Sequence, residues 1–528
     1  MFRRIAIVNR GEAAMRLVHA VRDLRAQRPD EPITTIALAT DEERTAMFAR
    51  EADEVHLLGP AADRPYLDHE RLARALTDTR ADAVWVGWGF VAEDPAFAEL
   101  VARLGLTFVG PSAEAMRRLG DKIGAKLLAE EVGVPVAAWS GGAVETLDEA
   151  LVAAERIGYP LMLKAAAGGG GRGIRRIDSP EALAESFERT RDEAARAFGS
   201  GALFLERLIT GARHVEVQVI ADAHGTAWAL GVRDCTVQRR NQKLIEESAS
   251  PLLDPARADE LRAAAERLVL AVGYVGAGTV EFLHQPEEDA FAFLEVNTRL
   301  QVEHPVTEVT NDLDLVTWQL RVAAGERLRD RPVEKGHAVE ARLNAEDPDR
   351  DFAPAPGRIA RFTPPSGPGI RVDTGVAEGD VIPAEFDSMI AKVIAHGRTR
   401  DEALARLRRA LGDTTVVVEG GATNKSFLLE LLDRPEVTGP GRRGTWADTA
   451  WIDRLRAEGG LVVDRHAAIA LVAAAIECTV EAERTEIARL LATARGGRPH
   501  TGHRGRTTVD LKLRGATHRL TCARTGPE

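Results

Sequence analysis

The segment "KAAAGGGGRGIRRI", residues Lys164–Ile177, holds four consecutive glycines between a lysine and an arginine: Gly168, Gly169, Gly170 and Gly171. Each glycine loses more backbone freedom on folding than any other residue, so such a run occurs either in a linker or where the backbone approaches a ligand too closely for a Cβ. The flanking segments "YPLMLKAA" and "IRRI" have the pattern of strands. We therefore expect a hairpin tip, which is either a simple turn or a flap whose bare N–H groups close over phosphate.

The composition of the chain excludes several classes of protein. Its 528 residues, of which 45% are hydrophobic, leave room for about three or four globular domains. The net charge of −12 argues against a general nucleic-acid-binding protein, which would carry basic patches. The longest apolar run, residues 467–476, is too short to span a bilayer and has charged flanks, so we expect no membrane association.

Two further features predict a cytoplasmic location. The chain opens with "MFRRIAIVNRGEAA", which predicts a strand followed by a helix rather than a secretory signal. Its cysteines, Cys235, Cys478 and Cys522, are scattered and indicate no disulfide framework, which fits a reducing compartment.

The order of the predicted elements divides the chain into four regions. In residues 1–111 strands alternate with amphipathic helices, which predicts a Rossmann-like parallel sheet covered on both faces. Residues 112–334 begin with helices and continue with hairpins and alternating strands, and about 135–205 would form a flap subdomain. Residues 335–448 are rich in short strands before a helix, "TRDEALARLRRAL", so this region is expected to be mixed α+β. The fold class is therefore α/β combined with α+β.

Residues 449–528 are expected to form a helical linker and the start of a further domain. The closing segment "TTVDLKLRGATHRLTCAR" predicts one hairpin, because Val509, Leu511 and Leu513 alternate with polar residues before a turn at Arg514–Gly515. A two-stranded hairpin is hardly stable by itself. We therefore expect this region to be the beginning of something longer.

Polar residues alternate with valines in the segment "RHVEVQVIAD" of the second region. In a strand, His214, Glu216 and Gln218 point to the face opposite the valines. Such a face either lines a cleft or forms the solvent side of an edge strand. The next segment, "RDCTVQRRNQKLIEES", carries a basic run that would by itself be typical of a solvated face.

A pair of carboxylates on two successive strands favours the cleft. Glu281 lies in one predicted strand and Glu295 with Asn297 in the next, joined by the hairpin "HQPEEDA". Antiparallel pairing can place Glu281 beside the other two, and buried carboxylates need a cation to neutralise them. Hard oxygen ligands suit Mg²⁺, which takes phosphate oxygens as further ligands. With the glycine flap and the lysines, this indicates an ATP site without a Walker-type G-x-x-x-x-G-K-[ST] motif.

At this point the sequence resembles the biotin carboxylase component of the biotin-dependent acyl-CoA carboxylases, whose central domain is an ATP-grasp fold. The similar segments include "NRGEAAMR", "GDKIGAK", "KAAAGGGGRG", "RDCTVQRRNQK", "EVNTRLQVEHPVTE", "ARLNAEDP" and "FDSMIAKVIAHGRTRDEAL", and they extend over residues 1–448. "NTRLQVEHPVTE" is highly specific, whereas the flap and the E…E-x-N pattern alone would leave other ATP-grasp ligases open. A biotin carboxylase of a pyruvate or urea carboxylase, and a non-catalytic docking module, are the alternatives.

The resemblance implies a role for each matching residue at the nucleotide. Lys122 and Lys164 would contact the phosphates of ATP, and Glu206 would contact adenine. The flap that closes over the phosphates would consist of Gly168, Gly169, Gly170 and Gly171. Further nucleotide-binding residues would be His214, Glu216 and Gln238. The ligands of Mg²⁺ or Mn²⁺ would be Glu281, Glu295 and Asn297.

The resemblance also implies a bicarbonate site next to the phosphates. This pocket would be lined by Lys243, Arg299, Gln301 and Val302. Glu303 would deprotonate bicarbonate, whose attack on the γ-phosphate would give carboxyphosphate, and Arg342 would stabilise the enolate of biotin. Biotin would arrive on a carrier domain, the carboxyl group would pass to a carboxyltransferase domain or subunit, and we expect an oligomer.

The sequence departs from the family pattern at several positions. The usual wording "HPGYGFLSEN" is replaced by "WVGWGFVAED", with Trp85 and Trp88, which is similar to large single-chain acyl-CoA carboxylases. Asn241 stands where the family usually has histidine, and Phe386 where it has tyrosine. The biotinylation motif A-M-K-M is absent from the sequence.

Overall fold

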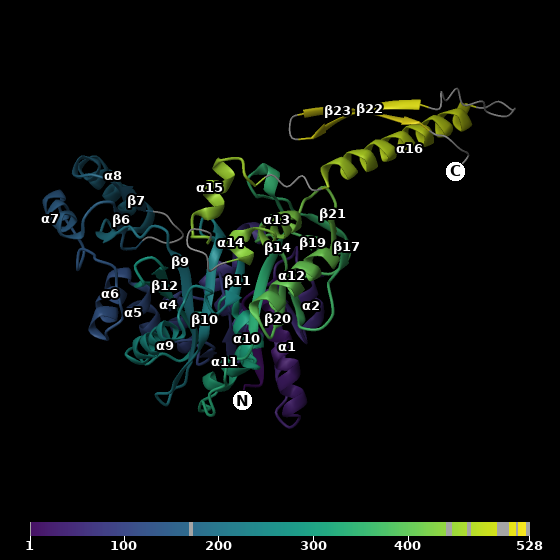
Figure 1. Ribbon diagram of the computed structural model, residues 1–528. Helices are drawn as coiled ribbons and strands as arrows, with labels where there is room; N and C mark the ends of the chain where they lie inside the picture. The colour runs from purple at the N-terminus through teal and green to yellow at the C-terminus, as the bar shows by residue number, and fades with distance from the viewer. Residues whose placement is uncertain are drawn as a thin grey trace. The chain divides into compact units, whose positions relative to one another are not determined.

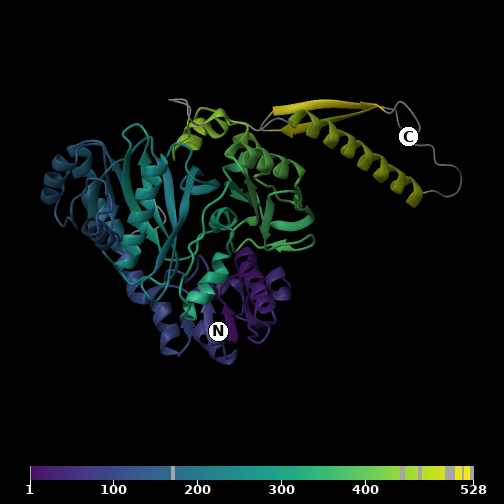
Figure 2. The same cartoon turned by 60° about the horizontal axis from the view of Figure 1, so that its bottom comes forward.

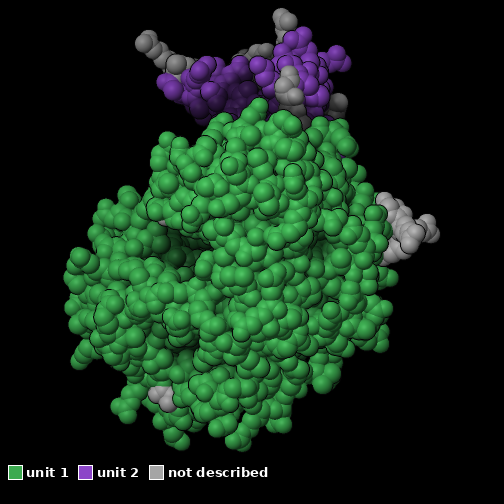
Figure 3. All heavy atoms as spheres, turned by 90° about the vertical axis from the view of Figure 1, so that its left-hand side faces the viewer, with its two compact units in different colours: residues 1–348, 352–458 green, residues 349–351, 459–528 purple. Residues whose placement is uncertain are grey.

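The computed structural model describes residues 2–167, 173–439, 446–461, 466–493, 506–513 and 516–523. These residues form two compact units, one of residues 1–348 and 352–458 and one of residues 349–351 and 459–528 (Figure 3). None of the helices within the described ranges is long and apolar enough to cross a bilayer.

Two of the predicted turns lie outside the described residues. One is the glycine flap, which comprises Gly168, Gly169, Gly170 and Gly171. The other is the predicted hairpin turn at Arg514–Gly515. The closure of the flap over phosphate therefore stays a prediction from the sequence.

The N-terminal region contains a five-stranded sheet in which all neighbouring strands are parallel, in the order β3-β2-β1-β4-β5. Successive residues of β1 enter two different cores: Ile5 packs with α1 on one face, and Ala6 packs with α3 and α4 on the other. This confirms the predicted parallel sheet covered on both faces. The elements are β1 (Arg4–Ile7), α1 (Gly11–Gln27), β2 (Thr34–Ala39), α2 (Met47–Glu51), β3 (Glu54–Leu57), η1 (Ala61–Asp63), η2 (Pro65–Leu67), α3 (His69–Asp78), β4 (Ala83–Trp85), α4 (Pro95–Arg103) and β5 (Thr107–Phe108).

A small sheet of strands β7-β6-β8 carries the segment that precedes the glycine run. Helices α7 and α8 share one hydrophobic core with these strands (Figure 1). A capping box at Thr146 and Glu149 fixes the start of α7, and the Ser179 side chain caps α8. The elements are α5 (Ala113–Gly120), α6 (Lys122–Glu131), α7 (Leu147–Ile157), β6 (Leu161–Ala165), β7 (Ile174–Ile177), α8 (Pro180–Phe198) and β8 (Leu203–Arg207).

The largest sheet has eight strands in the order β13-β12-β9-β10-β11-β14-β20-β18. Its first five strands come from the second predicted region and its last three from the third, so a single sheet continues across the predicted boundary near residue 335. This continuity brings side chains of β14 beside those of β11. The elements from the second region are β9 (Arg213–Ala221), β10 (Ala227–Arg239), β11 (Gln242–Ser248), α9 (Pro255–Leu270), β12 (Gly276–Gln285), β13 (Ala290–Asn297), α10 (His304–Asn311) and α11 (Leu315–Ala323).

The third region surrounds the end of this sheet with short strands and helices. Helix α1 of the N-terminal region, purple in Figures 1 and 2, contacts β18 and β20, which are green. The predicted helix "TRDEALARLRRAL" is confirmed as α12. The elements are β14 (His337–Asn344), β15 (Glu346–Asp347), η3 (Pro348–Arg350), β16 (Ala353–Pro354), β17 (Gly357–Thr363), β18 (Ile370–Thr374), β19 (Val381–Ile382), β20 (Met389–Gly397), α12 (Arg400–Asp413), β21 (Thr415–Val418), α13 (Lys425–Leu432), α14 (Pro435–Thr438) and α15 (Trp451–Ala457).

The second unit consists mainly of one long helix and one hairpin. Helix α16 (Ala467–Thr493) packs against strands β22 (Arg506–Leu513) and β23 (Ala516–Ala523). The two strands pair antiparallel over their whole length, which confirms the predicted hairpin. Along β22, exposed residues alternate with partly buried ones, as expected for a hairpin that packs one face against a helix.

Candidate active site

Strand β9 separates an apolar core from a buried polar cluster. Its valines, among them Val215 and Val217, lie in the core below the sheet. The alternating residues His214, Glu216 and Gln218 lie on the opposite face and are also buried. The alternative of a solvent-facing edge is thereby excluded, because β9 lies between β10 and β12 inside the sheet.

Glu216 is held by two cations within this cluster. Arg233, which is 1% exposed, donates from Nε to Glu216 Oε1 at 2.6 Å, and Lys243 Nζ donates to Glu216 Oε2 at 2.6 Å. Arg233 also donates to Gln218 Oε1 at 2.7 Å and to Thr307 Oγ1 at 2.9 Å. A buried carboxylate that accepts two charge-assisted hydrogen bonds is rigidly placed. Glu216 therefore holds Lys243 in place, and its predicted role at the nucleotide stays a prediction.

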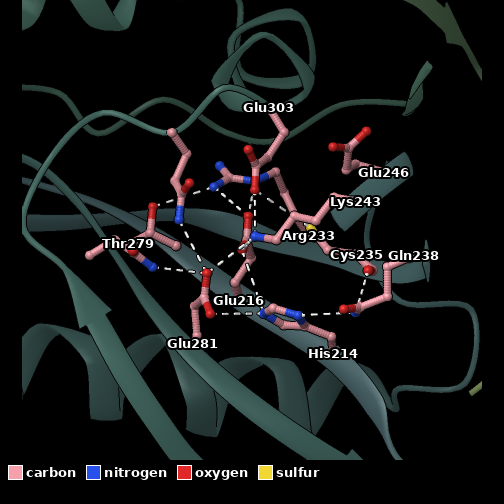
Figure 4. A network of polar contacts seen from close by, with 12 residues as sticks. His214, Glu216, Arg233, Cys235, Gln238, Lys243, Glu246, Thr279, Glu281 and Glu303 are labelled. Atoms are coloured by element: carbon pink, nitrogen blue, oxygen red, sulfur yellow. Dashed lines mark hydrogen bonds and ion pairs between the residues drawn. The ribbon is translucent and has the colours of Figure 1, made fainter. Parts of the chain in front are cut away.

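Glu303 is fully buried, and Figure 4 shows it next to Lys243. Lys243 Nζ donates to Glu303 Oε1 at 2.6 Å, and Arg342 Nη2 donates to Glu303 Oε2 at 2.9 Å. Burial by itself would raise the pKa of Glu303, but Lys243, Arg342 and Arg233 hold this pKa well below its usual range. The carboxylate is therefore ionised and able to accept a proton.

Four side chains contact the Glu281 carboxylate. Its Oε1 accepts from Asn297 Nδ2 at 2.8 Å, Lys243 Nζ at 3.1 Å and Gln301 Nε2 at 3.2 Å. His214 Nε2 lies 3.1 Å from the second oxygen, Oε2 (Figure 4). Burial would raise the pKa of Glu281, but Lys243 and His214 hold this pKa below its usual range. Glu281 thus contacts Lys243 and Gln301, which are predicted to line the bicarbonate pocket, and Asn297, which is predicted to bind the metal.

The paired carboxylates fit a divalent cation. Glu281 and Glu295 are directly opposite each other in the register of β12 and β13, and Thr279 is opposite Asn297. Burial and the nearby Glu281 carboxylate raise the pKa of Glu295, so the two negative charges disfavour each other. A hard cation between them would relieve this repulsion. His214, Glu216 and Glu281 also have potential ligand atoms within 4.8 Å of one another.

Arg299 reaches across to the N-terminal region. Its Nε donates to Glu93 Oε2 at 2.8 Å, while its other nitrogens donate to Gln301 Oε1 at 3.0 Å and Asn297 Oδ1 at 3.1 Å. Sequence reasoning placed Glu303 among Arg299, Gln301 and Lys243. The structure confirms the contact of Glu303 with Lys243, adds a contact with Arg342, and anchors Arg299 on Glu93.

The predicted nucleotide residues Lys164 and Glu206 contact each other. The Lys164 ammonium forms an ion pair with Glu206 Oε1, and Lys126, which is 3% exposed, forms another with Glu206 Oε2 at 2.9 Å. Lys122 begins α6, and burial lowers the pKa of its ammonium. Lysines thus gather on the side of the site where the phosphates are predicted.

Gln238, the remaining predicted nucleotide residue, is buried at the end of β10. Its side-chain amide donates to the Cys235 carbonyl at 3.1 Å and lies 3.3 Å from His214 Nδ1 (Figure 4). The structure therefore brings Gln238 and His214 together, and the second ring nitrogen of His214 faces Glu281.

Sequence reasoning did not assign several residues of the cluster. Arg233 and Cys235 stand in or next to the quoted segment "RDCTVQRRNQK", but register shifts in β10 break the simple alternation that would have shown which face they occupy. Burial raises the pKa of the Cys235 thiol well above its usual value, so the sulfur is neutral. Glu246 accepts a hydrogen bond from Arg342 Nε, a contact that depends on the pairing of β11 with β14.

Comparison with known proteins gives matches along most of the chain. Residues 1–116 match the family model "Biotin carboxylase, N-terminal domain", residues 121–331 match "Carbamoyl-phosphate synthase L chain, ATP binding domain", and residues 340–454 match "Biotin carboxylase C-terminal domain". Biotin carboxylase 1 of Bacillus subtilis is 44% identical over 437 residues, which cover 82% of this chain and 95% of that protein. The chain belongs to the biotin carboxylase family.

Other members of the biotin carboxylase family are similar over the same part of the chain. The biotin-dependent acyl-coenzyme A carboxylase alpha3 subunit of Mycobacterium leprae is 42% identical, with 85% of this chain and 74% of that protein covered. The crystal structure of a biotin carboxylase complex from Campylobacter jejuni superposes with a TM-score of 0.80 at 36% identity, covering 86% of this chain and 99% of that one. A biotin carboxylase domain dimer from Hydrogenobacter thermophilus, in complex with MgADP, ADP and bicarbonate, gives a TM-score of 0.79 at 38% identity, covering 86% and 98%.

The backbone conformation at position 241 suits an asparagine. Arg240 and Asn241 form the two-residue connection between β10 and β11, and their φ angles are +46° and +64°. Both angles lie in the left-handed region, which asparagine tolerates better than most residues. The Arg240 N–H also donates to Asp453 at 3.1 Å, so α15 contacts this turn.

Proposed function

We propose that this protein carboxylates biotin with ATP and bicarbonate, the first half-reaction of a biotin-dependent acyl-CoA carboxylase. The observation that carries the proposal is the position of Glu303, a buried and ionised carboxylate held between Lys243 and Arg342 and linked through Lys243 to Glu281. A base, two cations and a carboxylate pair for a metal thus lie in one connected cluster.

The first step is the deprotonation of bicarbonate. Bicarbonate is a poor nucleophile until it loses its proton, and Glu303 is ionised and can take it. Lys243 and Gln301 donate to the same oxygen of Glu281, and these two side chains together with Arg299 would bind the anion. The salt bridge of Lys243 to Glu303 would then be shared with the substrate, so that Lys243 orients bicarbonate toward its base.

The second step joins bicarbonate to the γ-phosphoryl group. An oxygen of the deprotonated bicarbonate attacks the γ-phosphorus, ADP leaves, and carboxyphosphate forms. Lys122 and Lys164 would stabilise the charge that gathers on the phosphoryl oxygens. Glu281, Glu295 and Asn297 would hold Mg²⁺ or Mn²⁺, which neutralises phosphate charge when bound.

The third step transfers CO₂ to biotin. Carboxyphosphate breaks into CO₂ and phosphate, and this phosphate removes the proton from the ureido nitrogen of biotin. Arg342 is fixed by Glu303 and Glu246, and its guanidinium would stabilise the negative charge on the ureido oxygen. The resulting biotin enolate attacks CO₂ through nitrogen to give carboxybiotin.

The reaction implies partners that lie outside this catalytic cluster. Several relatives are named as parts of larger carboxylases, among them the 2-oxoglutarate carboxylase small subunit of Hydrogenobacter thermophilus. We propose that biotin arrives on a carrier domain, that a carboxyltransferase domain or subunit receives the carboxyl group, and that the protein acts as an oligomer. The acyl-CoA acceptor would be selected by the carboxyltransferase.

Phosphate release by the purified protein tests the proposal. With MgATP, bicarbonate and free biotin we expect steady ATP cleavage that falls to a low residual rate when bicarbonate is removed with a CO₂-free buffer. Free biotin should increase the rate further, and ¹⁴C-bicarbonate should give acid-labile carboxybiotin. A rate of ATP cleavage that depends on neither bicarbonate nor biotin would contradict the proposal and favour another ATP-grasp ligase.

A further inference from the structure

Lys392, in the middle of β20, is a completely buried lysine that no step above uses. Its side chain is 0% exposed, and its Nζ donates to the main-chain carbonyl oxygen of Val302 at 2.9 Å. Val302 is the residue directly before Glu303. The ammonium is therefore hydrogen-bonded to the backbone of the catalytic segment, and Lys392 lies directly opposite Arg342 in the register of β14 and β20.

Three residues from different parts of the chain surround this ammonium. Glu12 of α1 forms an ion pair with it at 2.9 Å, and Asp373 of β18 lies 3.8 Å away. The ring of Trp88, in the loop after β4, lies with its centroid 5.1 Å from Nζ, within the range of a cation–π contact. The N-terminal region thus supplies Glu12 and Trp88, and the C-terminal region supplies Lys392 and Asp373.

The placement of the ammonium has an electrostatic cause. A lysine in a dry interior is costly unless it is paired, and Glu12 with Asp373 provides that pairing. The paired ammonium then offers its remaining donors in fixed directions, and a charged donor holds a carbonyl more strongly than a neutral one. Trp88 covers the ammonium and also contacts His304, the residue after Glu303, with ring centroids 5.8 Å apart.

The segment that receives this hydrogen bond is a turn rather than a strand. Helix α10 begins at His304, and Glu303 stands at its N-cap position with φ −81° and ψ 10°. Within the turn, the His304 N–H donates to the Gln301 carbonyl at 3.3 Å. The Val302 carbonyl is oriented from outside this turn by Lys392. That carbonyl belongs to the peptide that joins Val302 to Glu303, so a rotation of the peptide would move Glu303, which faces bicarbonate in the proposed function.

We infer that Lys392 is a positioning residue for the bicarbonate step, and that Glu12 and Trp88 make this positioning depend on the docked N-terminal region. The inference rests on the proposed function, because it assigns the turn 301–303 to bicarbonate. It gives a role to two sequence features that the ATP and metal sites do not use, the glutamate of "NRGEAA" and the second tryptophan of "WVGWG". The role is distinct from catalysis, since Lys392 acts through the Val302 peptide.

The first test is Lys392→Met, which keeps an unbranched side chain and removes the charged donor. We expect kcat/KM for bicarbonate to fall at least about tenfold, because a shift of about 1 Å in a catalytic group can cost up to about 10²-fold. The KM for MgATP should stay within about twofold of wild type. Lys425→Met is the matched control, since the Lys425 ammonium also donates to main-chain carbonyls, those of Gly412 and Thr414, far along the chain from the turn. This control should keep the wild-type KM for bicarbonate.

The second test examines the positioning role with variants that keep Lys392, so it is informative even if Lys392→Met does not fold. Trp88→Leu removes the aromatic face and should raise the KM for bicarbonate about threefold, as expected for loss of one cation–π contact. Trp88→Tyr restores an aromatic face and should restore this KM. Glu12→Gln should raise the same KM, because the ammonium loses its nearest carboxylate.

The outcomes separate the two proposals. A wild-type protein without bicarbonate-dependent ATP cleavage would overturn the proposed function, and the positioning role with it. If the wild type is active but Trp88→Leu, Glu12→Gln and any folded Lys392→Met keep the wild-type kcat/KM for bicarbonate, the positioning role alone is overturned. An equal rise of the KM values for bicarbonate and MgATP would also overturn it, since general loosening of the fold would explain that result.

Discussion

Arg342 and Glu303 are hydrogen-bonded to each other, with Arg342 Nη2 2.9 Å from Glu303 Oε2. The residue proposed to stabilise the biotin enolate therefore touches the residue proposed to deprotonate bicarbonate. Arg342 comes from β14 and Glu303 from the turn before α10, so the contact joins two distant parts of the chain. Deprotonation of bicarbonate and stabilisation of the biotin enolate would therefore depend on one ion pair. Variants of each residue can show whether the two steps are affected separately.

Glu303→Gln should remove the base while keeping a side chain of the same shape. We expect kcat for ATP cleavage to fall by about 10²–10⁴-fold, the usual cost of losing general-base catalysis. The KM for MgATP should change little, because Lys164 and Glu206, which are predicted to contact the nucleotide, pair with each other rather than with Glu303. Retention of the wild-type kcat would show that Glu303 is only a structural partner of Lys243.

Arg342→Ala should affect biotin rather than bicarbonate. Carboxylation of free biotin should fall by at least about 10²-fold, as for loss of a positioned charge donor, because the guanidinium proposed to stabilise the ureido oxygen is then missing. Slow ATP cleavage without biotin should survive, since Glu303 keeps Lys243 as a partner and carboxyphosphate can still form and hydrolyse. The comparison to make is biotin-independent phosphate release in Arg342→Ala and Glu303→Gln. Equal residual rates in the two variants would rule out the division of labour.

Glu295→Gln should abolish turnover while leaving the fold intact. The amide removes the repulsion that raises the pKa of Glu295 beside Glu281, but it binds Mg²⁺ poorly. We expect less than about a tenth of the wild-type kcat, a barrier change of more than about 1.4 kcal/mol. Glu287→Gln, on the exposed hairpin between the same two strands, is the matched control and should keep the wild-type response to Mg²⁺. A Glu295→Gln variant with normal activity would contradict the metal role.

Glu246→Gln should change how stability depends on pH. Burial raises the pKa of Glu246 from 4.5 to about 7, although Arg342 opposes the shift. Between these values the folded protein holds a proton that the unfolded chain lacks, so stability is fully present below pH 4.5 and is lost as pH rises through 7. The loss attributable to this group is roughly 3 kcal/mol, at about 1.36 kcal/mol per pKa unit. Glu246→Gln should lack this slope when thermal unfolding is compared between pH 5 and pH 8.

The neighbouring Glu247 provides a control of opposite sign. Although burial acts against ionisation, His337 and Arg400 lower the pKa of Glu247. Its contribution to stability is therefore present above the ordinary carboxyl pKa and is lost as pH falls, so Glu247→Gln should weaken the protein at pH 8 more than at acid pH. A parallel pH profile for both variants would show that the difference arises from packing rather than from ionisation.

Much of the site could be predicted because it depends on short-range patterns. The alternation in β9 predicted that His214 and Glu216 share a face, and the hairpin of β12 and β13 predicted that Glu281 meets Glu295 and Asn297. Side chains of a strand alternate strictly between faces, and a short hairpin leaves little choice of register. The parallel N-terminal sheet could be predicted for a similar reason, since strand–helix alternation with short connections allows few other arrangements.

The sequence by itself therefore determined the kinds of domain, the family and the residues that carry charge in the site. Only the tertiary structure decided which of these charges meet. Arg342 reaches Glu303 because β14 extends a sheet begun by β9–β13, Arg299 reaches Glu93 across 206 residues, and Lys392 reaches Val302 across 90. Such contacts depend on which strands become neighbours and on where a bulge changes the face to which the following side chains point. Both depend on the packing of the whole unit rather than on local residue spacing.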